Sequence, residues 1–317
     1  MNFIRNQVLY LPIDEGAARQ YIDARSTYVA LSQAKQKAKE VRGGLYWKKK
    51  DSQTYLIRTA TDNGQKSLGP KSEENELIYK NFVARKTSYE SRLSELKRTM
   101  GKMERLNRAL RVGRVPNIVV NLLQALEDAE VSDHFIVVGT HALYAYETEA
   151  GVLMASETIA TQDIDLLWDT RKRFKLATHL RREDVSIIDL LRKVDKSFQI
   201  REDQKYTAVN SGGFEVDIIR REVKEGDPHP IRISRHDDDF WVTQAKRADT
   251  LINAKRFSSV IVATNGEMAQ MNTIAPQSFV EFKQWLAKQD SREPIKRKRD
   301  LLQAKAIEQL LEQDLLI

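Results

Sequence analysis

The stretch DIDLLW, residues 163–168, constrains the fold of this chain more than any other. In a β-strand, side chains two residues apart project from the same face, so Asp163 and Asp165 share one face while Ile164 and Leu166 point to the other. Two carboxylates about 5 Å apart repel by roughly 3 kcal/mol at an effective dielectric constant of about 20, and a cation between them relieves that repulsion. The stretch therefore predicts a strand with one buried apolar face and one acidic face that holds a cation.

A second strand-like run, FEVDII at 214–219, places Asp217 in the same apolar setting. If the two strands are neighbours, the carboxylates of Asp163, Asp165 and Asp217 converge. The chain contains no cysteine, and no histidine cluster lies near these residues. A set of oxygen ligands suits Mg²⁺ or Mn²⁺ rather than zinc. These three aspartates are therefore the predicted ligands of Mg²⁺ or Mn²⁺.

A glycine turn precedes the acidic stretch. The run FIVV at 135–138 is β-branched or aromatic and ends at Gly139, which predicts a buried strand entering a turn. Thr140 is expected to cap a helix over about 141–146. A strand that stops at glycine and opens a helix presents backbone N–H groups to one point, which suits a phosphate. Gly139 and Thr140 are therefore candidate phosphate-binding residues.

These three motifs together resemble the polymerase-beta-like nucleotidyltransferase superfamily, whose pattern is a Gly-Ser or Gly-Gly turn, a paired acidic strand and a third acidic strand. Thr140 stands where serine or glycine is usual. Within the superfamily, the chain is similar to a bacterial family of nucleotidyltransferase-fold proteins with little-defined substrates. The similarity runs from about Gly43 to Leu311, through the segments GGLYWKKK, YLIR, SLGPKSEENELIYKNF, RVGRVPNIV, VVGTHALYAYETEAGV, ATQDIDLLWD and REPIKRKRDLLQA.

The resemblance implies an α+β fold, or mixed α/β fold, with a mixed sheet at its core, an N-terminal helical and β-hairpin arm, and a C-terminal helical region that closes over the nucleotide. It implies an enzyme in which Asp163, Asp165 and Asp217 are catalytic. The implied reaction is metal-dependent transfer of a nucleotidyl group from an NTP or dNTP to a hydroxyl, with release of pyrophosphate.

The acceptor stays open at this point. A nucleic acid or growing oligonucleotide is the first expectation, including template-independent synthesis of the kind that defence-associated relatives of the superfamily use against phage. Transfer to tRNA or to a protein hydroxyl, as in toxin-like relatives, is the second. A catalytically silent nucleic-acid-binding module on the same fold is the third, and a regulatory partner protein is compatible with each. The sequence does not predict the oligomeric state.

Positive charge is concentrated near the N-terminus. Residues 1–114 contain 24 Lys and Arg against 12 Asp and Glu, whereas the remainder contains 28 against 33. Two strand-like runs flank KKKDS at 48–52, which predicts a β-hairpin with a basic tip and interleaved aromatic residues. That composition suits stacking on bases and contact with phosphates, although a packed face of a small sheet has the same pattern. The predicted nucleic-acid-binding residues are Lys48, Lys49, Lys50 and Arg58.

Three regions are expected along the chain: a basic accessory region at 1–114, a catalytic core at 115–230 and a C-terminal hairpin and helical region at 231–317. Asn265-Gly266 predicts the hairpin turn. In the last region Lys283, Arg297 and Lys298 are candidate triphosphate ligands. The segment GQKSLGPKS at 64–72 is not a phosphate loop, because Pro70 removes a backbone N–H from the cradle. Helices are expected at about 13–41, 73–111, 117–129, 175–181, 186–194, 276–288 and 294–313.

Other patterns mainly exclude classes of protein. No run of 18 apolar residues occurs, and the N-terminal apolar run is too short for a signal peptide, so a cytoplasmic protein without membrane contact is expected. The motif HDDD at 236–239 resembles part of a metal-phosphohydrolase site, but the other histidines do not supply the remaining ligands. We therefore expect no hydrolase centre there.

Overall fold

The chain folds as two units in this computed structural model, which describes residues 8–61, 64–227 and 231–316. Unit 1 comprises Met1–Ala18 and Arg111–Ile317, and unit 2 comprises Arg19–Leu110. The predicted division at 114 and 230 stays a prediction. Pro230, at its second boundary, lies outside the described residues.

A mixed six-stranded sheet forms the centre of unit 1, with strand order β5-β7-β10-β9-β8 and β11 paired to β10. Strand β10 runs parallel to β7 and β11, whereas β5 is antiparallel to β7 and β9 is antiparallel to both β10 and β8. The expectation of a mixed sheet within an α+β fold is therefore confirmed. The strands are β5 (Phe135–Val138), β7 (Asp163–Trp168), β8 (Gln199–Ile200), β9 (Thr207–Val209), β10 (Glu215–Arg221) and β11 (Thr243–Ala245).

Two short antiparallel sheets accompany the central one. The hairpin of β12 (Arg256–Val262) and β13 (Met268–Ile274) turns at Asn265-Gly266, which confirms the prediction from that dipeptide. Its Thr273 hydroxyl donates a hydrogen bond to the Val137 carbonyl oxygen at 2.7 Å, so β13 lies beside β5. Strands β1 (Tyr10–Pro12) and β6 (Val152–Met154) form the other sheet. This pairing over about 140 residues was not anticipated from the sequence.

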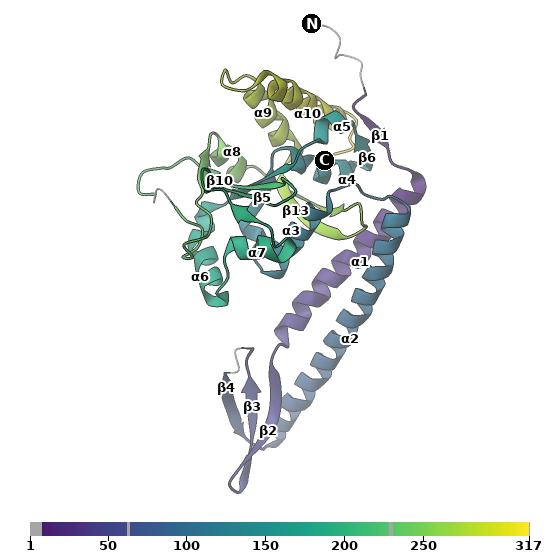
Figure 1. The fold of residues 1–317 in the computed structure, drawn as a ribbon. Helices are drawn as coiled ribbons and strands as arrows, with labels where there is room; N and C mark the ends of the chain where they lie inside the picture. Colours follow the sequence, from purple (N-terminus) through teal and green to yellow (C-terminus); the bar gives the residue numbers. More distant parts are fainter. Residues whose placement is uncertain (1–7, 62–63, 228–230, 317) are drawn as a thin grey trace. The chain divides into compact units, whose positions relative to one another are not determined.

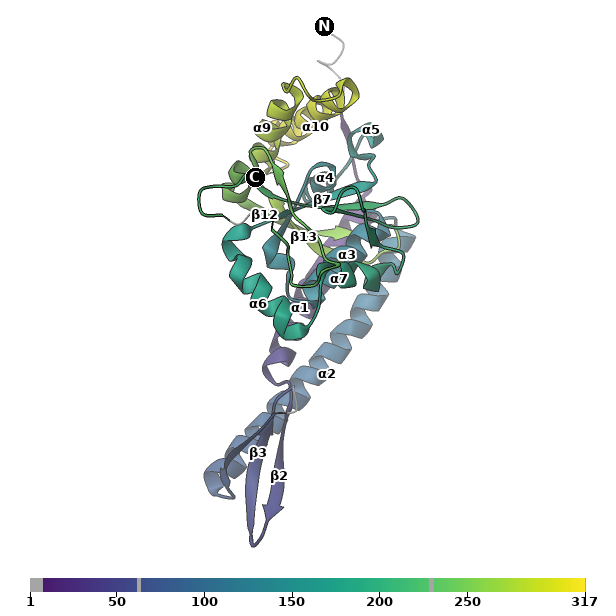
Figure 2. The same ribbon diagram turned by 60° about the vertical axis from the view of Figure 1, so that its left-hand side comes forward.

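The helices of unit 1 bury apolar residues against these sheets. Helix α3 presents Val119, Val120, Leu122, Leu123 and Leu126 to the core, and α7 begins with a capping box formed by Ser186 and Asp189. Figures 1 and 2 both show α9 and α10 packed together at one end of unit 1, with α6 at the other. The helices are α3 (Asn117–Asp128), α4 (Leu143–Ala150), α5 (Ser156–Ile159), α6 (Arg173–Glu183), α7 (Ile187–Val194), α8 (Ala248–Asn253), α9 (Pro276–Ala287) and α10 (Pro294–Glu312), with 3₁₀ turns η1 (Ser132–His134), η2 (Thr140–Ala142) and η3 (Thr170–Lys172).

Unit 2 consists of two long helices and a three-stranded antiparallel sheet. Helices α1 (Glu15–Glu40) and α2 (Glu73–Ala109) lie side by side, and the buried Gln20 side chain donates to Asn107 Oδ1 at 3.0 Å (Figures 1 and 2). The sheet has β3 (Gln53–Thr59) between β2 (Gly44–Lys50) and β4 (Gln65–Pro70). Ser72 caps α2 by accepting a hydrogen bond from the Asn75 backbone N–H.

None of the helices in the described part of the chain combines the length and the apolar character needed to cross a membrane.

Candidate active site

The two acidic strands are neighbours, which meets the condition under which the sequence predicted that their carboxylates converge. Strands β7 and β10 run parallel in a register that places Asp165 beside Asp217 and Asp163 beside Glu215. Their alternating residues are buried on the opposite face, where Ile164, Leu166, Val216 and Ile218 are each 0% exposed. The aspartates on the acidic face are only half-buried. The sheet therefore presents carboxylates from two adjacent strands on one accessible face.

Gly139 stands against this acidic face. Strand β5 pairs Val138 with Asp165, and Gly139 follows with φ 70° and ψ −152°. A Cβ atom at Gly139 would lie 2.3 Å from Asp165 Oδ2, closer than any real contact. The positive φ with this ψ is what requires glycine, and a side chain here would also displace the Asp165 carboxylate.

Thr140 behaves differently from the prediction. An expected α-helix over 141–146 with Thr140 as its cap is wrong, because the 3₁₀ turn η2 comes first and α4 begins at Leu143, and neither has a side-chain cap. The Thr140 hydroxyl instead accepts a hydrogen bond from Gln303 Nε2 at 3.1 Å, and Gln303 also donates to the Thr158 carbonyl oxygen at 2.6 Å. Helix α10 is thereby tied to the glycine turn.

Burial and mutual repulsion set the electrostatics of the acidic face. Burial, followed by the charges of Asp163 and Asp217, raises the pKa of Asp165 to about 7. Burial also raises the pKa of Asp217, against a hydrogen bond from the Thr207 hydroxyl. The Thr161 hydroxyl donates in the same way to Asp163. Negative charge on Asp165 and on Asp217 therefore costs the folded protein free energy.

The donor set at this face fits a hard cation. Asp163, Asp165 and Asp217 offer only oxygen atoms, and the raised pKa of Asp165 shows that a positive charge beside it would be stabilising. Within the described residues, however, no three Asp, Glu or His side chains are gathered as a ready-made metal site. Two of the three carboxylates are turned toward threonine hydroxyls instead. Each threonine hydroxyl occupies only the Oδ1 atom of its carboxylate, and the metal roles stay predictions.

The C-terminal helices place some of the predicted cations beside the aspartates and not others. Lys283 is 3% exposed and its Nζ lies 2.9 Å from Asp300 Oδ1, while Arg292 Nε donates to Asp300 Oδ2 at 2.8 Å. The charges of Lys283 and Arg292 both lower the pKa of Asp165, so this buried cluster borders the acidic face. Burial lowers the pKa of Lys283 itself.

Arg297 and Lys298 have other surroundings. The Arg297 guanidinium donates to the carbonyl oxygens of Arg292 at 2.8 Å and Asp290 at 2.7 Å, where it holds the connection between α9 and α10. Lys298 is exposed. Arg299 donates to the Ala160 carbonyl oxygen at 3.2 Å, just before the acidic strand. The structure thus brings Lys283, Arg292 and Arg299 toward β7, and leaves Arg297 in the helix connection.

His141 adds a buried neutral group next to the turn. Its ring is 0% exposed and stacks on Tyr144 at 5.6 Å and against Phe214 at 5.9 Å between centroids. Burial lowers its pKa to about 4, against the opposing effect of Asp163. The side chain is uncharged at neutral pH and packs between α4 and the start of β10.

The predicted nucleic-acid-binding residues belong to unit 2. Lys48, Lys49 and Lys50 are exposed and form the end of β2, since the turn itself is Asp51-Ser52. Lys48 lies across the strands from Tyr55, an arrangement of cation and aromatic ring on one face. Arg58 instead donates to the Arg42 carbonyl oxygen at 3.0 Å and covers the Phe82 ring at 4.5 Å. Arg58 therefore stabilises the base of the sheet.

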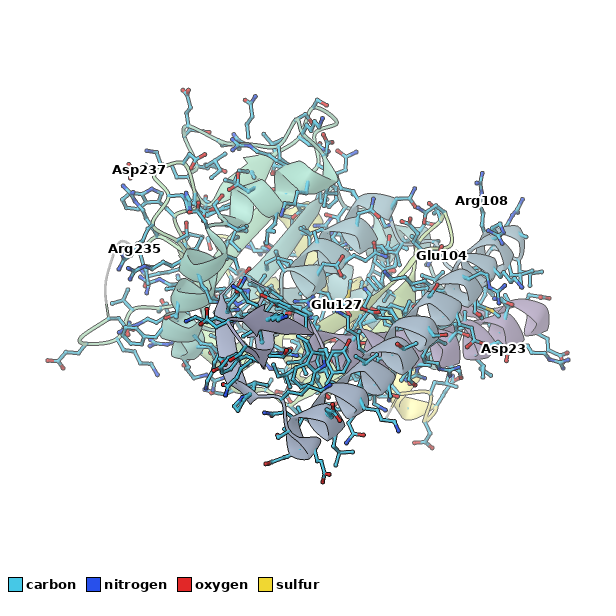
Figure 3. The ribbon with its side chains drawn as sticks, turned by 90° about the horizontal axis from the view of Figure 1, so that it is seen from below. Asp23, Glu104, Arg108, Glu127, Arg235 and Asp237 are labelled. Carbon is cyan, nitrogen blue, oxygen red and sulfur yellow. The ribbon has the colours of Figure 1, made fainter. Side chains whose placement is uncertain are left out.

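The HDDD motif has structural partners. Asp239 is 2% exposed and accepts hydrogen bonds from the backbone N–H groups of Ile187 and Ile188, both at 3.1 Å, at the start of α7. Asp238 pairs with Arg192 at 3.3 Å, and Asp237 pairs with Arg232. Figure 3 shows Asp237 and Arg235 on an outer loop of unit 1, and shows Asp23 and Arg108 on the helices of unit 2.

Comparison with known proteins gives one match. No curated protein and no solved structure is similar to the chain at a significant level. A family model described as nucleotidyltransferase matches residues 117–316, which is more than half of the chain and includes the acidic strands, the glycine turn and helices α9 and α10. The chain therefore belongs to this nucleotidyltransferase family.

Proposed function

We propose that unit 1 transfers a nucleotidyl group from an NTP or dNTP to a hydroxyl acceptor, with Mg²⁺ or Mn²⁺ bound to Asp163, Asp165 and Asp217. The observation that carries this proposal is the register of β7 and β10, which pairs Asp165 with Asp217 beside a turn that only glycine can form. Divalent ions at such a site stabilise the attacking and leaving oxygens of an in-line displacement at phosphorus.

The chain's own residues have distinct parts in this proposal. The three carboxylates would supply oxygen ligands on one accessible face, and Asp217 would complete the ion site near the attacking hydroxyl. The missing side chain of Gly139 leaves the backbone of the turn close to Asp165, where the triphosphate would lie. Gln303 fixes Thr140 from α10, and the Lys283, Arg292 and Asp300 cluster keeps positive charge behind the acidic face.

A transfer assay tests the reaction. The full-length protein is incubated with each labelled NTP or dNTP and Mg²⁺ or Mn²⁺, with and without total RNA, beside the Asp165→Asn variant. Glu222→Gln is the matched control, because Glu222 is an exposed acid just beyond the end of β10. A labelled RNA, an oligonucleotide ladder or a labelled protein that appears with wild type and Glu222→Gln but not with Asp165→Asn supports the proposal. If the protein binds the nucleotide in a metal-dependent way but forms no labelled product, it is a catalytically silent binding module instead.

For the acceptor we propose a nucleic acid or oligonucleotide, on the strength of the exposed lysines 48–50 beside Tyr55 and the positive excess in residues 1–114. Replacing the three lysines with Ala should weaken RNA binding and reduce its logarithmic salt slope by about 2 for single strands. Lys97, Arg98 and Lys102, exposed on α2, form a control triple of equal charge. An equal effect of both triples would mean that net charge alone matters.

Other acceptors and the biological role of the protein are further proposals with less support. The same labelling assay identifies tRNA or protein acceptors, because the labelled species differs in size and in sensitivity to ribonuclease or protease. A role in phage defence, a cytoplasmic location and a regulatory partner protein rest on the family resemblance and the sequence composition.

A further inference from the structure

A surface hollow of about 420 Å³ lies between helix α6 and the turn that precedes β5. Ligand pockets of proteins begin at roughly 300 Å³, so it can hold a small molecule or one nucleotide. The hollow belongs to unit 1 and to the part of the chain matched by the family model. Its lining includes His134, Phe174, Lys175, Thr178, His179 and Arg182.

The hollow is at the far end of strand β7 from the acidic face. Asp169, which follows β7, donates its backbone N–H to the His134 carbonyl oxygen at 2.9 Å. Four residues separate Asp169 from Asp165, which is roughly 13 Å along a strand. Figures 1 and 2 likewise place α6 and α10 at opposite ends of unit 1. A ligand in the hollow is therefore distinct from a nucleotide at the aspartates.

Hydrogen bonds fix the walls of the hollow before any ligand binds. His179 Nε2 bonds to the Ala129 carbonyl oxygen at 2.7 Å, and Lys172 Nζ donates to the Asp133 carbonyl oxygen at 3.1 Å. Because a carbonyl can only accept, His179 Nε2 carries a proton. These contacts hold α6 against the 129–134 turn and preorganise the site.

His134 is the feature that points to a ligand. Its side chain is 3% exposed, lines the hollow, and has no hydrogen-bond partner for Nδ1 within the described part of the chain. A buried polar atom without a partner costs about 1–3 kcal/mol, so native proteins rarely retain one unless something else satisfies it. Because Nδ1 is itself inaccessible to solvent, a polar group of a bound ligand would become its partner only after the His134 ring rotates toward the hollow.

The charges at the hollow select an anion. Lys175 and Arg182 flank it, and Glu130 is the one carboxylate in the lining. Lys175 is exposed and forms no ion pair or hydrogen bond among the described residues, while Arg182 uses only Nε, toward Glu183 at 2.8 Å. The remaining N–H groups of both side chains are available to a phosphate.

Phe174 adds an aromatic surface. It is 75% exposed, and the Arg173 guanidinium covers one face of its ring at 4.9 Å from the centroid. The high exposure leaves the other face open to solvent. Open aromatic rings beside cations are platforms on which nucleic-acid bases stack, at about 1–3 kcal/mol per base.

We propose that this hollow binds one nucleotide unit without a metal ion, with its base on Phe174 and its phosphate between Lys175 and Arg182, next to His134. The bound nucleotide is either a free mononucleotide or one residue of a single-stranded nucleic acid. The inference does not depend on transfer at the aspartates.

The test is nucleotide binding to the full-length chain in EDTA, which removes metal-dependent binding at the acidic face. In the Phe174→Trp variant, AMP or UMP stacking should quench fluorescence in a saturable way that the wild-type chain does not show. Equilibrium dialysis of labelled AMP against wild type measures the same affinity independently. Phe174→Ala should weaken that affinity about tenfold.

Matched variants separate the phosphate contact from general charge. Lys175→Ala with Arg182→Ala should reduce AMP affinity about tenfold and bring it close to the affinity for adenosine, whereas Arg181→Ala, an exposed position on the same helix outside the hollow, should have no effect. Absence of AMP binding, or binding that none of these variants changes, would overturn the proposal, as would equally tight binding of inorganic phosphate alone. A short oligoadenylate that binds at least tenfold tighter than AMP identifies a single strand as the source, and equal affinity identifies a free mononucleotide.

Discussion

Two aspartates on or next to strand β7 have pKa values shifted in opposite directions. Asp165 is partly open to solvent, forms no ion pair with the residues that the structure describes, and has a pKa raised to about 7. Asp169, four residues later, is 1% exposed. Burial alone would raise its pKa, but Arg171 donates to both of its oxygens at 2.8 Å, and the pKa is lowered. Arg256 adds a second cation at 3.6 Å.

This difference indicates that Asp169 is a structural carboxylate, whereas Asp165 is available to bind a cation from solution. Asp169 has its cation built into the fold, two residues along the chain. Asp165 faces other carboxylates, and the nearby Lys283 and Arg292 are bonded to Asp300 instead. A strand that leaves one carboxylate uncompensated is destabilised unless a cation is supplied from outside, which agrees with the proposed metal site.

The largest expected effect is on activity. Asp165→Asn keeps the size of the side chain but removes its charge, and nucleotidyl transfer should fall at least about a thousandfold, equivalent to about 4 kcal/mol of transition-state stabilisation. Initial rates at saturating Mg²⁺ measure this loss, with Glu222→Gln as control. Full activity in Asp165→Asn would remove Asp165 from the mechanism and leave the contrast with Asp169 unexplained.

Asp169→Asn should destabilise the fold. The substitution removes the charged partner of Arg171 from a buried position, which costs about 3 kcal/mol because half of Arg171 remains in water. Urea unfolding at pH 8 measures the change in the free energy of unfolding. A carboxylate with a lowered pKa stabilises the fold above its unfolded pKa, so the cost should persist at pH 8 and shrink only in acid, as pH falls through the folded pKa. A cost that is unchanged in acid would point to lost packing rather than lost charge.

Asp165→Asn should instead increase the free energy of unfolding, and it should do so over a different pH range. The pKa of Asp165 is about 7 in the folded protein and 3.8 in the unfolded chain. Protonation of Asp165 therefore favours the folded state below pH 3.8, and this contribution is lost as the pH rises through the folded pKa of about 7. At pH 8 the variant should therefore be more stable than wild type, by about 2 kcal/mol after solvent screening of a half-buried group. The gain should vanish near pH 4. Thermal unfolding in EDTA at both pH values measures this gain in stability. A variant less stable than wild type at pH 8 would show that the charge of Asp165 does not destabilise the fold.

The local part of this site was readable from the sequence, because alternation within a strand and glycine after a strand are short-range signals. The DIDLLW and FEVDII patterns predicted the two faces of β7 and β10, although the pairing of these strands was only assumed, and Asn265-Gly266 predicted its hairpin.

The long-range part was not readable. Gln303 reaches Thr140 across 163 positions, and Lys283 meets Asp300 between two different helices, so neither contact has a local periodicity. Lys283, Arg297 and Lys298 all looked like free cations in the sequence, since only packing decides which is buried with a partner and which is exposed. A charged residue on the buried side of each helical pattern, as at Lys283 and Asp300, is the signal that could have paired them.

The smallest predicted effect concerns the cation itself. Mg²⁺ at ten times its dissociation constant should stabilise wild type by about 1.4 kcal/mol, because an ion that binds only the folded state shifts unfolding by mass action. Asp165→Asn should lose this response, while Asp169→Asn, whose carboxylate is already satisfied by Arg171, should retain it. Thermal unfolding at pH 8 with increasing Mg²⁺ measures the shift for all three proteins. If Asp165→Asn gained as much as wild type, the ion would be stabilising another part of the chain, and the distinction between the two aspartates would be one of burial alone.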